Sequence, residues 1–200
     1  MTIYFTSDLH FGHKLVAKIR GFGDDALAPD MHDDHLMSVW GSTVRPTDVV
    51  WVLGDLSVGH REEAKALEIL KQLPGKKHLV FGNHDSGHPM HSDAQKSFAK
   101  YLDVFETVSS VAHIKSNKQK IILSHFPYNG EGDRPGERYP EWRVRDMGTT
   151  PLIHGHTHSS TKYSLSDKGT PQLHVGLDAW DLQLVHEKYV HAWVREALGF

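Results

Sequence analysis

The sequence predicts a layered α/β fold in which a second β-sheet packs against the first. In the first half of the chain, short runs rich in Ile, Val, Phe and Tyr alternate with helical patterns, which is the β-α-β order of a layered α/β core. The second half is richer in strands, so we expect it to supply the second sheet. The 200 residues suit a single domain, 1–200, because no linker or internal repeat divides them.

Five short apolar runs are the predicted core strands, because their length and composition favour buried strands over helices. They are Ile3–Phe5, Val49–Leu53, His78–Phe81, Lys120–Leu123 and Pro151–Ile153. Amphipathic segments between them predict helices at Pro29–Ser42, Arg61–Leu73 and His91–Leu102. Further strands are predicted at Val104–Val108, Val111–Lys115, Gln172–Val175 and Tyr189–Arg195, the last because its residues alternate between two faces. Tyr128–Asp146 is expected to be a long loop, and such loops are often functional.

The composition argues against several classes of protein. A net charge of -3 provides no overall basic field for duplex nucleic acid or an anionic membrane. The absence of cysteine excludes disulfides, thiolate zinc sites and cysteine nucleophiles. The chain shows no signal-peptide pattern and no apolar stretch of ~18 residues, so we expect a cytoplasmic protein without a membrane partner. The oligomeric state is not indicated.

Seven potential metal ligands follow the predicted strands. They are Asp8, His10, Asp55, Asn83, His125, His156 and His158. Open α/β sheets bind ligands beyond the carboxyl ends of their strands, so these side chains are expected to share one edge. We expect an extended backbone to project Asp8 and His10 to one side, and Gly155 to allow a sharp bend. Nitrogen and oxygen donors favour Mn, Fe, Co, Ni or Zn over soft metals and calcium.

These motifs resemble those of the calcineurin-like metallophosphoesterases. In order, the chain carries D-x-H from Asp8, G-D at Asp55, G-N-H-D around Asn83, an isolated His125, and G-H-x-H ending at His158. The segment VGLDAWD, with Asp178 and Trp180, resembles one seen in small bacterial and phage-type members. The resemblance implies a four-layer αββα fold, with two mixed β-sheets sandwiched between helices. It also implies two divalent metal ions, and we expect manganese to be the most activating.

The resemblance also implies how the ligands divide between the two ions. The set for one ion is Asp8, His10, Asp55 and His158. The set for the other ion is Asp55, Asn83, His125 and His156, so that Asp55 is shared. The implied reaction is attack on a phosphoester by a hydroxide that bridges the ions. His84 is the implied catalytic residue, which stabilises the phosphoryl charge or protonates the leaving oxygen, and Asp85 is expected to orient it.

The predicted substrate is a small phosphodiester, with 2′,3′-cyclic nucleotides as one candidate. Two divalent ions balanced by Asp8, Asp55 and hydroxide leave one positive charge, which suits the single negative charge of a diester. The alternatives are a phosphomonoesterase or nucleotidase of the same superfamily, and a catalytically silent metal-binding module. The protein Ser/Thr phosphatase branch is a poorer match, since GDLSVGH and GNHD stand where that branch carries GDxVDRG and GNHE.

Four further residues are candidates for facing the substrate, namely His13, Tyr128, Asn129 and Arg134. His13 either lines the site beside His10 or begins a helix. Arg134 shares its loop with further arginines that could grip a phosphate or be solvated, namely Arg138, Arg143 and Arg145. His154 is expected to be structural. Most other histidines are expected at the surface, namely His32, His35, His60, His78, His88, His91, His113, His186 and His191.

Overall fold

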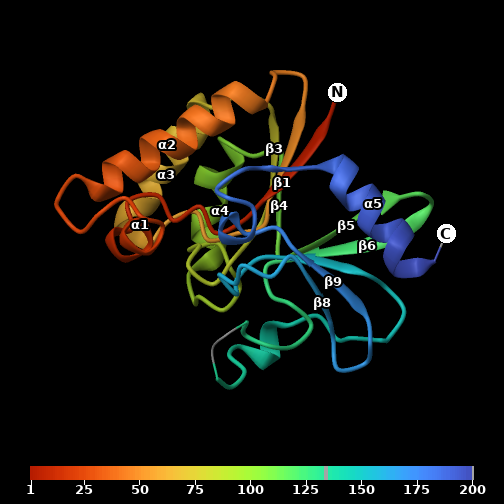
Figure 1. The fold of residues 1–200 in the computed structure, drawn as a ribbon. Helices are drawn as coiled ribbons and strands as arrows, with labels where there is room; N and C mark the ends of the chain where they lie inside the picture. Colours follow the sequence, from red (N-terminus) through yellow and green to blue (C-terminus); the bar gives the residue numbers. More distant parts are fainter. Residues whose placement is uncertain (133–134, 200) are drawn as a thin grey trace.

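Two five-stranded β-sheets form the centre of the molecule (Figure 1). The structure is a computed structural model that describes residues 1–132 and 135–199, apart from the side chain of His60. Both sheets contain parallel and antiparallel pairs, which confirms the predicted α/β class with two mixed sheets. Within the described part of the chain, no helix has the length and apolar character needed to cross a membrane.

The first sheet is a parallel sheet with one antiparallel edge strand, in the order β10-β1-β2-β3-β4. Its strands are β1 (Ile3–Thr6), β2 (Val49–Val52), β3 (Lys76–Val80), β4 (Thr107–Ser109) and β10 (Val185–His186). The intervening helices are α1 (Lys14–Ile19), α2 (Ala28–Thr43), α3 (His60–Gln72) and α4 (Ala94–Leu102). Because β1, β2 and β3 run parallel, the loops that follow them start from the same edge of the sheet.

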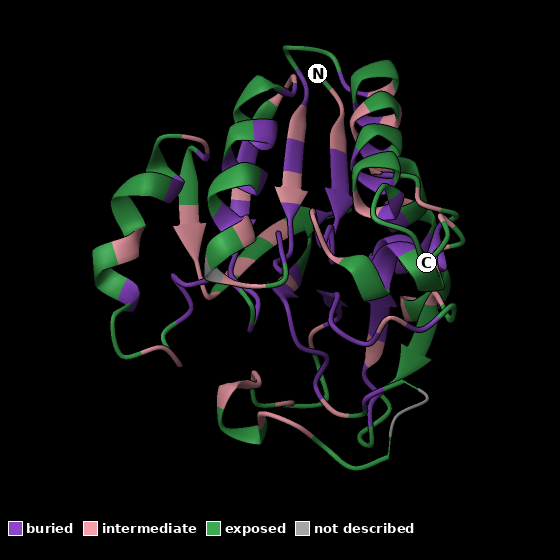
Figure 2. Cartoon of the chain, turned by 90° about the vertical axis from the view of Figure 1, so that its left-hand side faces the viewer, coloured by how far each residue is buried: buried purple, intermediate pink, exposed green. Residues whose placement is uncertain are grey.

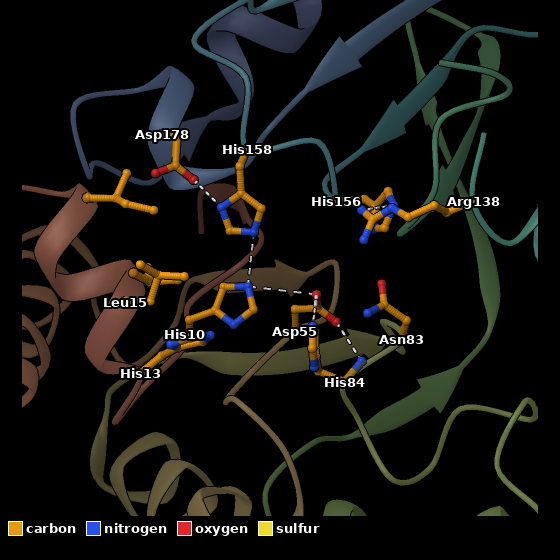
Figure 3. A pocket seen from close by; sticks show the side chains of 12 residues that line it. His10, His13, Leu15, Asp55, Asn83, His84, Arg138, His156, His158 and Asp178 are labelled. Carbon is orange, nitrogen blue, oxygen red and sulfur yellow. Dashed lines mark hydrogen bonds and ion pairs between the residues drawn. The ribbon is translucent and has the colours of Figure 1, made fainter. Parts of the chain in front are cut away.

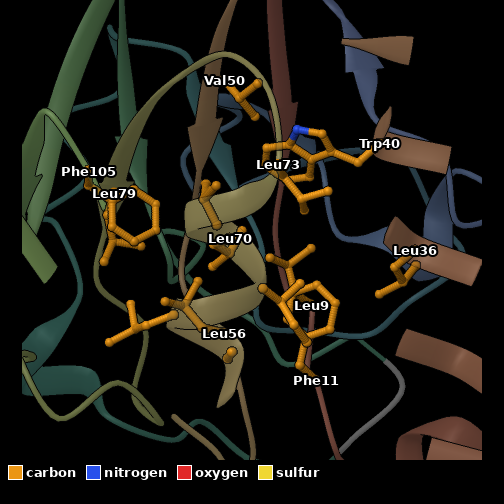
Figure 4. Close-up of a cluster of buried hydrophobic side chains, with 14 of the residues drawn as sticks. Leu9, Phe11, Leu36, Trp40, Val50, Leu56, Leu70, Leu73, Leu79 and Phe105 are labelled. Atoms are coloured by element: carbon orange, nitrogen blue, oxygen red, sulfur yellow. The ribbon is translucent and has the colours of Figure 1, made fainter. Parts of the chain in front are cut away.

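One hydrophobic cluster joins this sheet to its helices (Figure 4). Leu70 of α3 and Trp40 of α2 are almost completely buried against Val50 and Leu79 of the strands. The Trp40 indole also donates a 2.9 Å hydrogen bond to the Pro74 carbonyl, so its one polar atom is satisfied. Figure 2 shows the result, with buried strands beside helices whose outer faces are exposed.

The second sheet has the order β5-β6-β7-β9-β8. Its strands are β5 (Val111–Ser116), β6 (Gln119–Ser124), β7 (Leu152–His154), β8 (Tyr163–Leu165) and β9 (Pro171–His174). A second hydrophobic cluster lies between the sheets, where Phe5 and Val80 of the first sheet pack with Leu123, Ile153 and Leu173 of the second. This packing fixes the position of the loops after β6 and β7 relative to those of the first sheet.

The segment predicted as a strand at Tyr189–Arg195 is a helix, α5 (Glu187–Leu198). The prediction was wrong because the apolar residues of this segment fit both the two-residue period of a strand and the 3.6-residue period of a helix. The buried ones are Val190, Trp193 and Val194, which is the i, i+3, i+4 stripe of an amphipathic helix. Gly199, with φ of 74°, ends the helix in the left-handed conformation that favours glycine.

Helices cover the two sheets unevenly. α5 packs against β1 and β10 of the first sheet and against β5 and β9 of the second. On the second sheet, the loop after β6 packs on the face that carries Gln172, whose side-chain oxygen accepts a 2.6 Å hydrogen bond from the Tyr128 backbone. The loop after β6 therefore covers this part of the second sheet.

Two histidines predicted at the surface are buried. His32 lies between the Arg20 guanidinium and the Asp33 carboxylate, at 3.0 and 3.2 Å. His88 packs its ring against Phe126 and accepts a hydrogen bond from the backbone of Met90. Their polar contacts satisfy the imidazoles inside the protein, which a pattern of single residues does not reveal. The prediction for His60 concerns a side chain outside the described part of the structure.

Candidate metal centre

The structure brings the candidate ligands together in two adjacent groups. One contains Asp8, His10 and His158, and the other Asp55, His125 and His156. Within each group the potential ligand atoms lie within 4.8 Å of one another. Figure 3 shows His10 and His158 on one side of Asp55, with Asn83 and His156 on the other.

Left-handed backbone conformations turn most of these side chains toward the centre. The φ angles are 59° at Asp8, 49° at His10, 57° at Asp55, 71° at His156 and 53° at His158. Asp and His adopt this region more readily than most residues, although it is uncommon for any residue other than glycine. The expected extended spacing of Asp8 and His10 was therefore wrong, because both lie in a loop beyond the end of β1.

Two glycines permit close packing around the ligands. A Cβ on Gly54, where φ is 87°, would overlap the backbone nitrogen of Gly82 and lie 2.9 Å from His125 Nδ1. A Cβ on Gly155 would overlap the Ser7 hydroxyl and lie 2.6 Å from Asp8 Oδ2. The chain does bend directly after Gly155, where the Thr157 N–H donates a 2.9 Å hydrogen bond to the Gly155 carbonyl, although Gly155 itself does not have a positive φ. Glycine is required at this position because of the close contact with the Asp8 loop, not because of a left-handed backbone conformation.

The first half-site consists of Asp8, His10 and His158. The Nε2 atoms of His10 and His158 are 3.1 Å apart, and His158 Nε2 is 3.7 Å from Asp8 Oδ1. The other nitrogen of His158, Nδ1, lies 2.9 Å from Asp178 Oδ2. Both Asp178 oxygens accept 2.9 Å hydrogen bonds from the Arg20 guanidinium. A carboxylate held by an arginine therefore fixes the orientation of the His158 ring.

The second half-site consists of Asp55, Asn83, His125 and His156. Around His125 Nε2 lie His156 Nδ1 at 3.2 Å, Asn83 Oδ1 at 3.2 Å and Asp55 Oδ2 at 3.4 Å. His125 Nδ1 lies 2.7 Å from the carbonyl oxygen of Leu53. The second half-site therefore has oxygen and nitrogen donors converging on one point, as the first does.

The tautomers of two histidines fit a bound cation. His158 and His125 each have one nitrogen beside an oxygen acceptor, namely Asp178 and the Leu53 carbonyl. A proton on that nitrogen leaves the other nitrogen with a lone pair directed at the centre. The paired nitrogens are 3.1 and 3.2 Å apart, close to the about 3.4 Å expected for two imidazoles on one tetrahedral ion.

The electrostatics also favour positive charge at this point. Burial lowers the pKa of His10 and of His156, so both are neutral imidazoles able to act as ligands. Burial also opposes charge on His125, but the Asp55 carboxylate outweighs it and raises the pKa of His125 to about 9. The chain thus concentrates negative charge where a proton or a metal cation can balance it. The donor set fits hard or borderline divalent ions.

His84 lies at the opening of the centre rather than within it. Its side chain is 41% exposed, and its Nε2 is 4.0 Å from Asp55 Oδ2. Its backbone N–H donates a 2.9 Å hydrogen bond to Asp55 Oδ1, which fixes the start of the side chain. Figure 3 shows the ring beside Asp55, within the same pocket as His10 and His158. His84 is thus free to contact a ligand that approaches the centre.

Asp85 does not orient His84, contrary to expectation. Its carboxylate accepts hydrogen bonds of 2.7 Å from Gly82, 3.0 Å from Asp55 and 3.0 Å from Leu56, all from backbone N–H groups. Burial, and then the charge of Asp55, raise the pKa of Asp85 to about 7. The residue instead ties together the loops after β2 and β3, which carry Asp55 and Asn83.

The predicted substrate-facing residues have different locations. His13 lines the pocket, which has a volume of ≈ 150 Å³, and it also precedes α1, so both interpretations of His13 hold. Tyr128 and Asn129 do not line this pocket. The Tyr128 hydroxyl donates to the Thr150 carbonyl at 2.8 Å, and Asn129 Oδ1 accepts from the Asp167 backbone at 3.1 Å. Arg134 lies outside the described residues.

Sequence reasoning missed Glu131, which is the buried anchor of the long loop. Its carboxylate contacts His156 Nε2 at 3.1 Å, accepts a 2.8 Å hydrogen bond from Arg138 Nε, and is paired with Arg143. Arg138 Nη2 also lies 3.1 Å from His156 Nε2, and Arg138 lines the pocket. The spacing of these residues follows no motif, because an irregular loop brings them together. The only signal was the loop length itself.

Known proteins resemble this chain in sequence and in fold. The family described as Calcineurin-like phosphoesterase matches residues 1–160. The gene 66 protein of Mycobacterium phage L5 is 43% identical over 185 residues, covering 88% of this chain and 86% of that protein. Protein MJ1445 of Methanocaldococcus jannaschii is 36% identical over 160 residues, covering 79% and 70%. The solved structure of AQ665 from Aquifex aeolicus has a TM-score of 0.68 at 24% identity, covering 96% and 98%. The chain therefore belongs to the calcineurin-like phosphoesterase family.

Proposed function

We propose that the chain is a metal-dependent phosphodiesterase for a small substrate, with residues 1–200 acting as one catalytic domain. The observation that carries this proposal is the pair of adjacent ligand groups around Asp55, which open into a pocket lined by His84. Two divalent ions held side by side are a usual arrangement for hydrolysis of phosphoesters. Manganese is the proposed activating ion, with Fe, Co, Ni and Zn as alternatives of the same donor preference.

The residues proposed to hold the two ions are those of the two half-sites. Asp8, His10 and His158 would hold the first, and Asn83, His125 and His156 the second, with Asp55 between them. When bound, the ions would place positive charge beside the phosphoryl oxygens and make a water acidic enough to attack at neutral pH. The neutral state of His10 and His156, whose pKa values are lowered by burial, supports this assignment.

His84 is the proposed catalytic residue outside the ligand set. Its exposure and its position beside Asp55 allow contact with a phosphoryl oxygen or with the oxygen of the leaving group. A protonated imidazole there would stabilise negative charge and then supply a proton as the ester bond breaks. Asp85 is proposed as a positioning residue, because it fixes the backbone of Asp55 and Gly82 rather than the His84 ring.

Charge favours a diester as the substrate. Two divalent ions, less the charges of Asp8, Asp55 and an attacking hydroxide, leave one positive charge for a singly charged diester. The second candidate is a phosphomonoesterase, and a specific observation supports it. Arg138 lines the same pocket and brings a further positive charge, which a dianionic monoester could use.

The test is a comparison of two model substrates after loading the protein with Mn²⁺, Fe²⁺, Co²⁺, Ni²⁺ or Zn²⁺. We expect bis-p-nitrophenyl phosphate to be hydrolysed with a higher kcat/KM than p-nitrophenyl phosphate, most rapidly with Mn²⁺. Preference for the monoester would move the assignment to a phosphomonoesterase. Two bound ions without turnover of either substrate, or of 2′,3′-cyclic nucleotides, would indicate a catalytically silent metal-binding module.

A further inference from the structure

Two large apolar side chains stand exposed beside the polar metal centre. Leu15 and Ile19 of α1 are 58% and 72% exposed, and both line the same pocket as His10, Asp55 and His84. They are four residues apart, so they lie on one face of the helix, one turn above the other. Exposed apolar surface that gathers at a functional pocket marks a place where a ligand excludes water.

The rest of α1 has other partners. Val16 and Ala17 are buried, so a second apolar face attaches the helix to the protein. Lys18 lies 2.7 Å and Lys14 4.0 Å from the carboxylate of Asp24. The charged side chains of α1 are therefore drawn toward Asp24, and the face that lines the pocket is left uncharged. Figure 3 shows Leu15 projecting from α1 beside His10 and His13.

Arg138 gives the pocket a second wall of the opposite character. In Figure 3 it lies across the centre from Leu15, beside His156. Its guanidinium is held by Glu131 through a 2.8 Å hydrogen bond from Nε, yet its side chain remains 41% exposed. The pocket thus offers a cation at one end, the candidate metal centre in the middle and an apolar surface at the other end.

We propose that this site takes a phosphoester that carries an apolar group, such as an aromatic ring. The apolar group packs on Leu15 and Ile19, while the phosphoryl group lies between the metal centre and Arg138. A substrate whose ester groups are short and polar, such as a glycerol ester, leaves Leu15 and Ile19 in water and gains nothing from α1. The inference deepens the proposed function, on which it rests, by naming the class of ester group.

The test compares two phosphonates that the enzyme cannot hydrolyse, methylphosphonate and benzylphosphonate. Their anionic groups are alike, and only benzylphosphonate has a ring. Binding is measured by calorimetry on the Mn²⁺-loaded protein. We expect benzylphosphonate to bind about tenfold more tightly, the effect of covering roughly 55 Å² of apolar surface. In the variant Leu15→Ser/Ile19→Ser the two affinities should become nearly equal.

The matched control is Leu102→Ser, a change at a leucine of α4 that is 55% exposed and does not line the pocket. It should keep the preference for benzylphosphonate. Arg138→Gln should weaken both phosphonates by a similar factor, because it removes a contact with the shared anionic group. A second readout is NMR of the Zn²⁺-loaded protein, in which the benzyl ring should shift the methyl signals of Leu15 and Ile19.

Equal affinities of the wild-type protein for the two phosphonates would overturn the inference. So would a preference that survives Leu15→Ser/Ile19→Ser, or failure of both phosphonates to bind. The proposed function fails in a different way, since the protein would bind benzylphosphonate with the expected preference but hydrolyse no phosphoester. The calorimetry and the hydrolysis assay therefore separate the two claims.

Discussion

The first half-site is held by groups close to regular secondary structure, whereas the second depends on a long loop. Behind the first, Arg20 at the end of α1 has a side chain that is 2% exposed, and its guanidinium links Asp178 to the backbone carbonyl of Asp8, at 2.8 Å. Behind the second, Glu131 and its arginines belong to the loop between β6 and β7. In both, a carboxylate fixes the histidine of the G-H-x-H motif and an arginine fixes the carboxylate.

Because of this difference, we expect the two half-sites to differ in metal affinity and in their response to substrate. Asp178 follows β9 in a short 3₁₀ turn (Leu177–Ala179), so its position is set by the core between the sheets. Glu131 reaches His156 from a segment whose anchors are polar, and the same segment carries Arg138 into the pocket. We therefore expect the first ion to be bound more tightly, and the second half-site to be the one that substrate contacts influence.

The largest effect is expected from the residue that the half-sites share. Asp55→Asn removes the charge that lies 3.8 Å from His10 Nε2 and 3.4 Å from His125 Nε2. Both ions should bind more than about 100-fold more weakly, and hydrolysis should fall below detection. Plasma mass spectrometry of the dialysed protein measures the bound metal. Retention of one ion at full affinity would show that Asp55 serves only one half-site.

His84→Gln should reduce turnover without affecting either half-site. Because His84 has no place in either ligand group, both ions should remain bound. We expect kcat for bis-p-nitrophenyl phosphate to fall by about 100- to 10,000-fold, as for loss of a proton donor or charge-stabilising group. Kinetics and metal content of the same sample check this. Loss of an ion together with activity would make His84 a ligand instead.

The carboxylates behind the half-sites allow each one to be weakened separately. Asp178→Asn should lower the affinity for the first ion, and Glu131→Gln for the second, each by about 10- to 100-fold. Calorimetric titration with Mn²⁺ distinguishes a tight and a weak step. Asp103→Asn, a change at an exposed carboxylate, is the control. If both variants weaken the same Mn²⁺-binding step, Asp178 and Glu131 do not support separate half-sites.

The smallest effect concerns acid, which should loosen the second half-site first. Glu63 is buried and accepts hydrogen bonds from Ser86, at 2.8 and 2.7 Å, and from Tyr101, at 2.6 Å; it also pairs with Lys100. Burial opposes its charge, but these partners prevail and hold the pKa of Glu63 below its usual value. Its stabilisation is therefore complete above the ordinary pKa of glutamate and is lost as pH falls through the lower, folded-state pKa.

Glu63 bears on the second half-site because its partner Ser86 lies in the loop between β3 and α4, which also carries Asn83 and His84. Glu63→Gln should reduce the free energy of unfolding by about 1–3 kcal/mol at pH 7, and by less in acid. Urea unfolding at several pH values measures this. Hydrogen exchange should show the Asn83–Ser86 amides opening before those of Asp8 and His10. If acid reduces the free energy of unfolding of the wild type and of Glu63→Gln by the same amount, the stabilising role assigned to Glu63 is contradicted.

The sequence predicted what depends on local pattern. The ligands could be found because each follows a strand, and parallel strands bring their following loops to one edge. Asp85 and Glu131 were different, because their partners are backbone N–H groups and loop arginines that no spacing specifies. The helix α5 was missed because Val190, Ala192 and Val194 alternate as in a strand, whereas the stripe that the helix buries is Val190, Trp193 and Val194. The sequence did not indicate a role for Leu15 and Ile19. Exposed apolar residues are common, and a role for these two can be inferred only from the pocket beside them.

The most direct test of the account is anomalous diffraction from crystals of the Mn²⁺-loaded protein at the manganese edge. The account predicts two peaks per chain, one among Asp8, His10 and His158 and the other among Asn83, His125 and His156, with Asp55 contacting both. The His158 and His156 rings should keep their contacts with Asp178 and Glu131. A single peak, or a peak outside these two groups, would contradict a centre built from two separately supported half-sites.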